Sequence, residues 1–238
     1  MVDIGDKTSS MVKGSQQNRP RHRASLVFLL ACGMLIVVEL IDEISVIKAQ
    51  PTEANLLPAW LRAWDLVGFT LINERLSWNV LDPIMLVVTR IGSTVFWLLV
   101  SVLLWTGNKR REAVLLTVGI VVGELVLLPV KFFLPRARPS LVVQGARALD
   151  IESGASFPSG HSKNGFTVFV ILGSKWRRLR LPLFAIACLI AMSRIYIGVH
   201  WPFDVIAGSL VGWIIGQFTI RYETKIINTF NSIPGVAI

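Results

Sequence analysis

The chain has 238 residues, of which 53% are hydrophobic and 16% are charged, and its formal net charge at pH 7 is +9. This composition excludes a disordered chain and is too apolar for an ordinary soluble domain. Basic chains often bind nucleic acid, but the long apolar segments of this one make a membrane protein the leading interpretation.

Six apolar segments follow residues 1–24, which are polar and which we expect to be a flexible cytoplasmic tail. The segments are 25–47, 83–106, 112–134, 161–174, 180–197 and 203–220. A helix needs about 20 apolar residues to span a bilayer core, so the fourth and fifth segments are short for this role. We predict an all-α polytopic membrane protein, with a six-helix domain over residues 25–220 and a C-terminal cytoplasmic tail over 221–238. A large soluble helical core is disfavoured because the segments are not amphipathic.

The connection between the first two segments, residues 48–82, contains an apolar stripe with helical spacing. The stripe consists of Trp60, Leu61, Trp64, Val67, Phe69, Leu71 and Ile72. Trp is enriched at membrane–water boundaries, which predicts an additional interfacial helix on the outer leaflet. A loop packed over the helix bundle is an equally good interpretation.

Basic residues are distributed as expected for cytoplasmic termini. The two tails and the loops after segments two and four carry 14 basic and four acidic residues, whereas the rest of the chain carries ten basic and 11 acidic residues. Because Lys and Arg concentrate in cytoplasmic loops, this predicts six crossings of the plasma (inner) membrane with both termini inside. Segment one is expected to be a retained anchor, since no cleavage pattern follows its acidic end. The excess charge then reflects topology, and no nucleic-acid partner is expected.

Three residues within the apolar segments need an explanation. Glu124 is an intramembrane carboxylate, which is a functional candidate by default, although pairing with a polar neighbour is the favoured interpretation. Cys32 and Cys188 have neither a disulfide framework nor metal-ligand spacing. We therefore expect no metal site and no cofactor.

The first of three polar clusters lies where the third segment ends. Pro135 disfavours helix in the residue before it, so Lys131 is expected in the last helical turn and Arg138 in the outer loop. Arg presents a planar pair of donors that fits phosphate, and Lys supplies a mobile charge. Alone, the two cations are better explained as residues that snorkel to the interface.

The second cluster, Pro158-Ser159-Gly160-His161, precedes the fourth segment. It is typical of a turn that runs into a helix N-terminus, where free backbone N–H groups and the helix dipole favour an anion. Ser159 adds a hydroxyl, and His161 stands beside the anion position. A simple helix cap with an interfacial histidine is an equally good interpretation of this cluster alone.

The third cluster joins Arg194, at the end of segment five, to His200 and Asp204 at the start of segment six. Residues four apart meet on one side of a helix. A carboxylate bonded to one ring nitrogen raises the basicity of the other, which is one way to make a histidine nucleophilic. With alternating crossings, all three clusters reach the same side of the membrane, so two histidines, three cations and one carboxylate are expected to share one cavity.

The combined pattern Lys-x6-Arg-Pro, Pro-Ser-Gly-His and Ser-Arg-x5-His-x3-Asp resembles the type-2 phosphatidic acid phosphatase superfamily, from Lys131 to Asp204. The resemblance implies that His200 attacks phosphorus and forms a phosphohistidine, that Asp204 orients His200, and that His161 protonates the leaving oxygen. The implied phosphate-binding residues are Lys131, Arg138, Ser159, Gly160 and Arg194. Ser193 matches the motif and is expected to support the site. Lys163, just beyond it, either contacts a second phosphate or snorkels.

The resemblance implies an integral membrane lipid phosphatase with its site on the extracytoplasmic face. Its expected substrate is a phosphorylated membrane lipid, such as a polyprenyl diphosphate, phosphatidylglycerol phosphate, phosphatidic acid or a lipid A phosphate. Phosphotransfer between two lipids through the same phosphohistidine is an alternative. A non-catalytic lipid or solute transporter is a weaker one, because His200 and Asp204 are both present. Vanadate-dependent haloperoxidases share the motifs, but six membrane segments argue against them.

Overall fold

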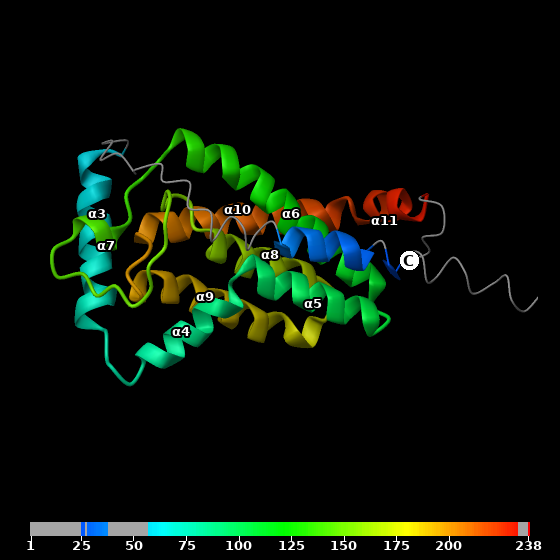
Figure 1. Cartoon of the computed structure of the whole chain (residues 1–238), viewed down its shortest axis with the longest axis horizontal. Coiled ribbons are helices and arrows are strands. Elements are labelled where there is room, and N and C mark those ends of the chain that lie inside the picture. Colours follow the sequence, from blue (N-terminus) through cyan, green and yellow to red (C-terminus); the bar gives the residue numbers. More distant parts are fainter. Residues whose placement is uncertain (1–24, 27, 38–56, 233–237) are drawn as a thin grey trace, which may run out of the picture.

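The computed structural model describes residues 25–26, 28–37 and 57–232 together with residue 238, and the predicted tail over residues 1–24 lies outside these ranges. The described residues form helices and no strands, as predicted. Figure 1 shows α5, α6, α8, α9 and α10 running along one bundle axis, while α3 lies across one end of the bundle. The helices are α3 (Ala59–Thr70), η1 (Leu71–Arg75), α4 (Asp82–Ile91), α5 (Thr94–Thr106), α6 (Arg110–Phe133), α7 (Pro139–Val142), α8 (Gly160–Lys175), η2 (Arg177–Leu179), α9 (Arg180–Tyr196), α10 (Pro202–Arg221) and α11 (Glu223–Asn231).

Each predicted segment coincides with helix in the described ranges, but the helices differ in length. Arg110–Phe133, Arg177–Tyr196 and Pro202–Arg221 are long and apolar enough to cross a membrane. Helix α8 has 16 residues, and Phe28–Val37 is a shorter apolar helix. The chain therefore has several apolar helices, and the count of six crossings stays a prediction.

The second predicted segment, residues 83–106, is divided between two helices in the structure. Helices α4 and α5 meet at a break and are bent by 57°. Ser93 starts the new helix, because its hydroxyl accepts a hydrogen bond from the Phe96 amide at 3.2 Å. Gly92 at the bend packs so closely that a Cβ there would lie 2.6 Å from Ile190 Cγ2 and 3.0 Å from His161 Cβ. The bend thus lies directly against one of the predicted site residues.

Helix α3 supplies the helix predicted between the first two segments, although residues 48–56 of that connection lie outside the described ranges. Trp60, Trp64 and Val67 are exposed, whereas Asp65 and Phe69 are fully buried. The exposed aromatic face suits an interfacial helix. Its location at a membrane surface stays a prediction.

Helix α11 packs against the far end of the bundle and lies within the predicted C-terminal tail. Ile227 of α11 joins the main apolar cluster. Glu223 at the start of α11 forms ion pairs with Arg111, at 2.5 Å, and with Lys175. Residues 223–231 are therefore packed and paired with the bundle.

Helices α8 and α10 make the closest contact in the bundle, through glycines spaced four residues apart on α10. A Cβ on Gly208 would lie 2.3 Å from the Ser159 carbonyl oxygen, and one on Gly212 would lie 2.1 Å from the Lys163 carbonyl oxygen. The Thr167 hydroxyl also donates to the Gly212 carbonyl at 3.1 Å. Small residues that let two backbones approach in this way are typical of membrane helix packing.

We expect Gly212→Ala to destabilise the protein, because its new methyl group meets backbone that no side-chain rotation can move aside. Overpacking of this kind costs about 1–3 kcal/mol. Gly33→Ala is the matched control, since a Cβ there has nothing within 4 Å. Thermal unfolding in detergent, followed by tryptophan fluorescence, should give a lower melting temperature for Gly212→Ala only. Equal melting temperatures would show that the two helices can separate at no cost.

Candidate active site

The N-terminus of α8 is anchored to the first turn of α10. The Ser159 hydroxyl caps α8, accepting from the Ser162 amide at 3.4 Å and the Ser162 hydroxyl at 3.0 Å. The Ser159 amide donates to the Asp204 carbonyl at 3.0 Å. The free amides that follow Ser159, including that of Gly160, lie at the positive end of the helix dipole. Because the Ser159 hydroxyl serves as the cap, its contact with a phosphate stays a prediction.

His200 lies in the connection between α9 and α10, with Asp204 in the first turn of α10. The His200 Nδ1 atom is 3.6 Å from Asp204 Oδ2. Asp204 Oδ2 accepts from the Trp201 amide at 3.0 Å. On the other side of the ring, Nε2 lies 3.3 Å from Nη1 of Arg138. The predicted pair is thus brought together, with Nδ1 and Oδ2 just beyond hydrogen-bond distance.

Two of the three predicted cations converge beside His200. Arg138 and Arg194 are 3% and 0% exposed. Arg138 donates to the carbonyl of Val199 at 3.0 Å and to that of Ser153 at 3.0 Å. Arg194 donates to the Thr89 hydroxyl. Each guanidinium is therefore held in place by neutral acceptors and keeps further N–H groups for an anion.

The anion that Arg138 and Arg194 contact is Glu152, which was not among the residues predicted from the sequence. One carboxylate oxygen lies 3.0 Å from Nη1 of Arg138, and the other forms an ion pair with Nη2 of Arg194. Glu152 also lies within electrostatic range of His161 and His200. An internal carboxylate thus occupies the position between the arginines where a phosphoryl group was expected.

The third cation, Lys131, lies within electrostatic range of Arg138 and Glu152. His161 lies within the same range of Arg194, Glu152 and His200. It also lies against the α4–α5 bend, because a Cβ on Gly92 would be 3.0 Å from its ring atom Cδ2. All three sequence clusters therefore meet at one end of the bundle.

The charges at the site give His200 and Glu152 unusual pKa values. Burial lowers the pKa of His200 to about 4, and Arg138 and Arg194 act in the same direction while Asp204 opposes them. His200 is therefore neutral at pH 7, with one ring nitrogen unprotonated. Burial would raise the pKa of Glu152, but Arg194 and Arg138 hold it well below its usual range. Glu152 is therefore an anion at neutral pH.

Glu124 and Lys163 form a buried ion pair next to this cluster. Lys163 is fully buried, and its Nζ lies 2.7 Å from Oε1 of Glu124. The same oxygen accepts from the Thr94 hydroxyl at 2.7 Å. The favoured interpretation of Glu124, pairing with a polar neighbour, is what the structure has. Of the two alternatives for Lys163, snorkelling is excluded, because its amine is paired inside the bundle.

Two further charged residues that the sequence analysis missed are Arg136 and Asp65. Arg136 bridges Asp204 and Asp65 with two 2.6 Å contacts. One signal in the sequence could have found Asp65, since it stands four residues from both Leu61 and Phe69 on the buried side of α3. Within the described ranges, no group of three or more His, Cys, Asp or Glu residues is arranged to hold a metal ion.

Comparisons with known proteins identify the family of the chain. A family model, that of the PAP2 superfamily, matches residues 112–227, which include all three clusters. An undecaprenyl-diphosphatase of Sulfolobus acidocaldarius is 29% identical over 165 residues, which are 66% of this chain and 77% of the relative. A decaprenylphosphoryl-5-phosphoribose phosphatase of Mycobacterium tuberculosis is 30% identical over 122 residues, 50% of this chain and 67% of the relative.

The fold is also that of a solved membrane protein. The crystal structure of the first transmembrane PAP2 type phosphatidylglycerolphosphate phosphatase from Bacillus subtilis superposes with a TM-score of 0.62 and 23% identity. The superposition covers 85% of this chain and 97% of that one. The all-helical membrane fold is therefore shared well beyond the region that carries the motifs.

We expect Glu152→Gln to bind inorganic phosphate more tightly than the unsubstituted protein. Glutamine keeps the shape of the side chain but removes the negative charge that a phosphate must displace from Arg138 and Arg194. A tenfold gain corresponds to about 1.4 kcal/mol, and a gain of this order should appear in titration calorimetry in detergent. Asp150→Asn is the matched control, since Asp150 lies in the same loop but pairs with Arg90, 3.2 Å away. Equal phosphate affinities in both variants would contradict competition between Glu152 and phosphate.

The pKa of His200 also predicts how stability depends on pH. Because this pKa is about 4 in the folded protein, against an ordinary value of 6.5, the unfolded chain binds more protons between these two values. The melting temperature should therefore fall as pH decreases through this window. His200→Gln lacks this titration, so its melting temperature should fall less over the same window. Parallel curves for the two proteins would contradict a depressed pKa.

Proposed function

The chain belongs to the PAP2 superfamily and is a lipid phosphate hydrolase embedded in a membrane, and on that premise we propose that it cleaves a lipid phosphate through a phosphohistidine formed on His200. The observation that carries the proposal is the anion between Arg138 and Arg194, beside the Nε2 atom of a neutral histidine. A phosphoryl group in the place of the Glu152 carboxylate would meet two fixed guanidinium groups. Phosphoryl transfer depends mainly on such positioning and charge stabilisation.

In the first step, Nε2 of His200 attacks phosphorus and the bond from phosphorus to the lipid oxygen breaks. His161 donates a proton to the leaving oxygen, which departs as the alcohol or phosphate of the lipid. Asp204 stabilises the positive charge that the attack creates on the His200 ring. Arg138, Arg194 and Lys131 neutralise the three phosphoryl oxygens, with the Ser159 hydroxyl and the Gly160 amide as further donors.

In the second step, a water molecule attacks the phosphohistidine. His161, now neutral, takes a proton from this water, the nitrogen–phosphorus bond breaks, and inorganic phosphate leaves. Both histidines return to their starting states. The protons balance within the site because His161 serves first as the acid and then as the base.

The substrate we propose is a lipid with a phosphomonoester or terminal phosphate. The related proteins named above act on polyprenyl phosphates and on a glycerophospholipid, which share a charged head and apolar tails. Apolar side chains of α6 next to the site, including Phe132 and Phe133, are exposed at 77% and 74% and would face such tails. Lys163 is engaged by Glu124, so we assign it no contact with a second phosphate.

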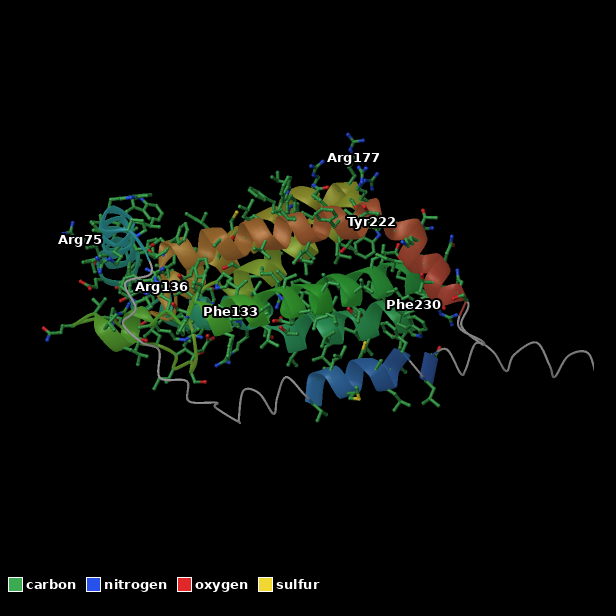
Figure 2. All side chains as sticks on the ribbon, turned by 90° about the horizontal axis from the view of Figure 1, so that it is seen from above. Arg75, Phe133, Arg136, Arg177, Tyr222 and Phe230 are labelled. Carbon is green, nitrogen blue, oxygen red and sulfur yellow. The ribbon has the colours of Figure 1, made fainter. Side chains whose placement is uncertain are left out.

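The site is proposed to face the outside of the plasma membrane. Figure 2 shows Arg136 at one end of the bundle, and Arg177 and Tyr222 at the other. The end marked by Arg177 carries the basic loops that the charge distribution assigns to the cytoplasm. The end marked by Arg136 carries the three clusters.

The decisive test is phosphate release by purified protein in detergent with a chelator present, from a panel of lipid phosphates. His200→Ala should reduce kcat by about 10³-fold or more, as loss of a nucleophile does in other enzymes. The unsubstituted protein should also yield an acid-labile phosphoprotein on rapid quenching, and His200→Ala should not. Cys188→Ala, on the exposed side of α9, is the control substitution outside the site and should retain the kcat of the unsubstituted protein. Undiminished turnover by His200→Ala would rule out His200 as the nucleophile.

A further inference from the structure

We propose that Arg136 is a positioning residue for this reaction, which orients Asp204 toward His200 and is itself held by Asp65 of α3. The inference rests on the proposed phosphohistidine chemistry. It assigns a role to two residues that the three motifs do not specify, and it makes the helix that lies across the bundle end a part of the site (Figure 1).

Arg136 is held on both edges of its guanidinium group. Nη1 lies 2.6 Å from Oδ1 of Asp204, and Nη2 lies 2.6 Å from Oδ2 of Asp65. Its side chain is 14% exposed, while those of both carboxylates are fully buried. The guanidinium carbon also lies 4.9 Å from the centre of the Trp201 ring. Two ion pairs and one ring contact fix the plane of the group, which is the geometry for which arginine is suited.

This arrangement determines which oxygen of Asp204 faces the histidine. Arg136 engages Oδ1, so Oδ2 is left for the Trp201 amide and for Nδ1 of His200. Without Arg136, the carboxylate of Asp204 could rotate about its terminal bond, and Oδ2 would no longer be held toward Nδ1 of His200. An outer partner that fixes an orienting group in this way is a recurring feature of histidine sites.

Asp65 connects Arg136 to α3. Its second oxygen accepts from the Phe203 amide at 2.7 Å, at the free N-terminus of α10. The contact is reinforced by packing, because a Cβ on Gly68 would lie 3.0 Å from Pro202 and the Phe69 ring lies 5.5 Å from that of Trp201. Asp65 thus fixes both Arg136 and the helix turn that carries Asp204.

Arg136 is unsuited to bind phosphate directly, unlike Arg138. Its donors are directed at two buried carboxylates, and a phosphate would have to displace one of them. The three groups together carry a net charge of −1, which leaves His200 with an anionic neighbour that is already paired. Loss of Arg136 would both free Asp204 and leave two buried carboxylates uncompensated.

The principal test compares Arg136→Gln with Arg147→Gln. Arg147 is the matched control, because it pairs with Asp82 at 2.7 Å at the same end of the bundle but does not contact Asp204. We expect Arg136→Gln to lower kcat by about 10–100-fold with little change in KM, as loss of outer partners does elsewhere. Arg147→Gln should retain kcat. Arg136→Lys should recover only part of the loss, since lysine lacks the planar fork.

A double-mutant cycle separates positioning from general destabilisation. In an Asp204→Asn background, adding Arg136→Gln should change kcat by less than about twofold, because residues that act as a unit are not additive. Asp65→Asn keeps an acceptor for the Phe203 amide and should lower kcat less than Arg136→Gln does. If Arg136→Gln fails to fold, Asp65→Asn takes its place in the cycle with Asp204→Asn. Adding Asp65→Asn to Asp204→Asn should then change kcat by less than about twofold. Additive losses would overturn the proposal.

The pH profile gives an independent readout. The charged groups that interact with His200 include Arg138, Arg194 and Asp204, together with Glu152 and His161. Removing the positive charge of Arg136 makes the surroundings of the His200 ring more negative whichever way Asp204 turns, so the acidic limb of kcat should move to higher pH in Arg136→Gln and stay in place in Arg147→Gln. An unmoved limb in Arg136→Gln would contradict the proposal. Lack of phosphate release by the unsubstituted protein would instead refute the proposed function itself.

Discussion

The close approach of α8 to α10 is the contact on which the rest of the site depends. Gly208 and Gly212 bring the α10 backbone against the carbonyl groups of Ser159 and Lys163. The Ser159 amide then reaches the Asp204 carbonyl. Both helices start at the same end, so their N-terminal amides and dipoles add to one positive field. Because Gly208 and Gly212 have no side chains, the two helices can approach this closely. Their approach sets the distance between His161 of α8 and Asp204 of α10.

The second constraint is that buried charges must be paired. Arg138 and Arg194 are almost completely removed from solvent, and an unpaired guanidinium in such a place is costly. Glu152 compensates them in the free protein. A phosphoryl group would exchange one anion for another, so the arginines would remain paired throughout a cycle. The same loop residue would therefore both compensate the two arginines and compete with a phosphoryl group for them.

Much of this site could be predicted from residue order, because helix ends are visible in a sequence. Pro135, the Ser159-Gly160 turn and Pro202 mark where helices end or begin, and alternating crossings bring those ends together. Glu152 and Arg136 were missed for a different reason. Both lie in the connection between α6 and α8, and their partners depend on how that loop folds, which no periodicity records. The bend at Gly92-Ser93 was also missed, since its apolar flanks read as one continuous segment.

The bundle concentrates its buried charges in one of its two halves. Trp97, Leu98, Leu115, Leu116 and Ile171 belong to an apolar cluster away from the site. The other half buries Asp65, Arg138, Lys163, Arg194 and Asp204. Buried ion pairs contribute little net stability against well-packed apolar residues, so apolar packing holds the helices together in both halves, including around Phe69, Trp201 and Val205 at the site end. On the proposed function, the charges retained at the site end would bind and transfer a phosphate, and a defect in the α8–α10 contact would weaken both the helix packing and the arrangement of these charges.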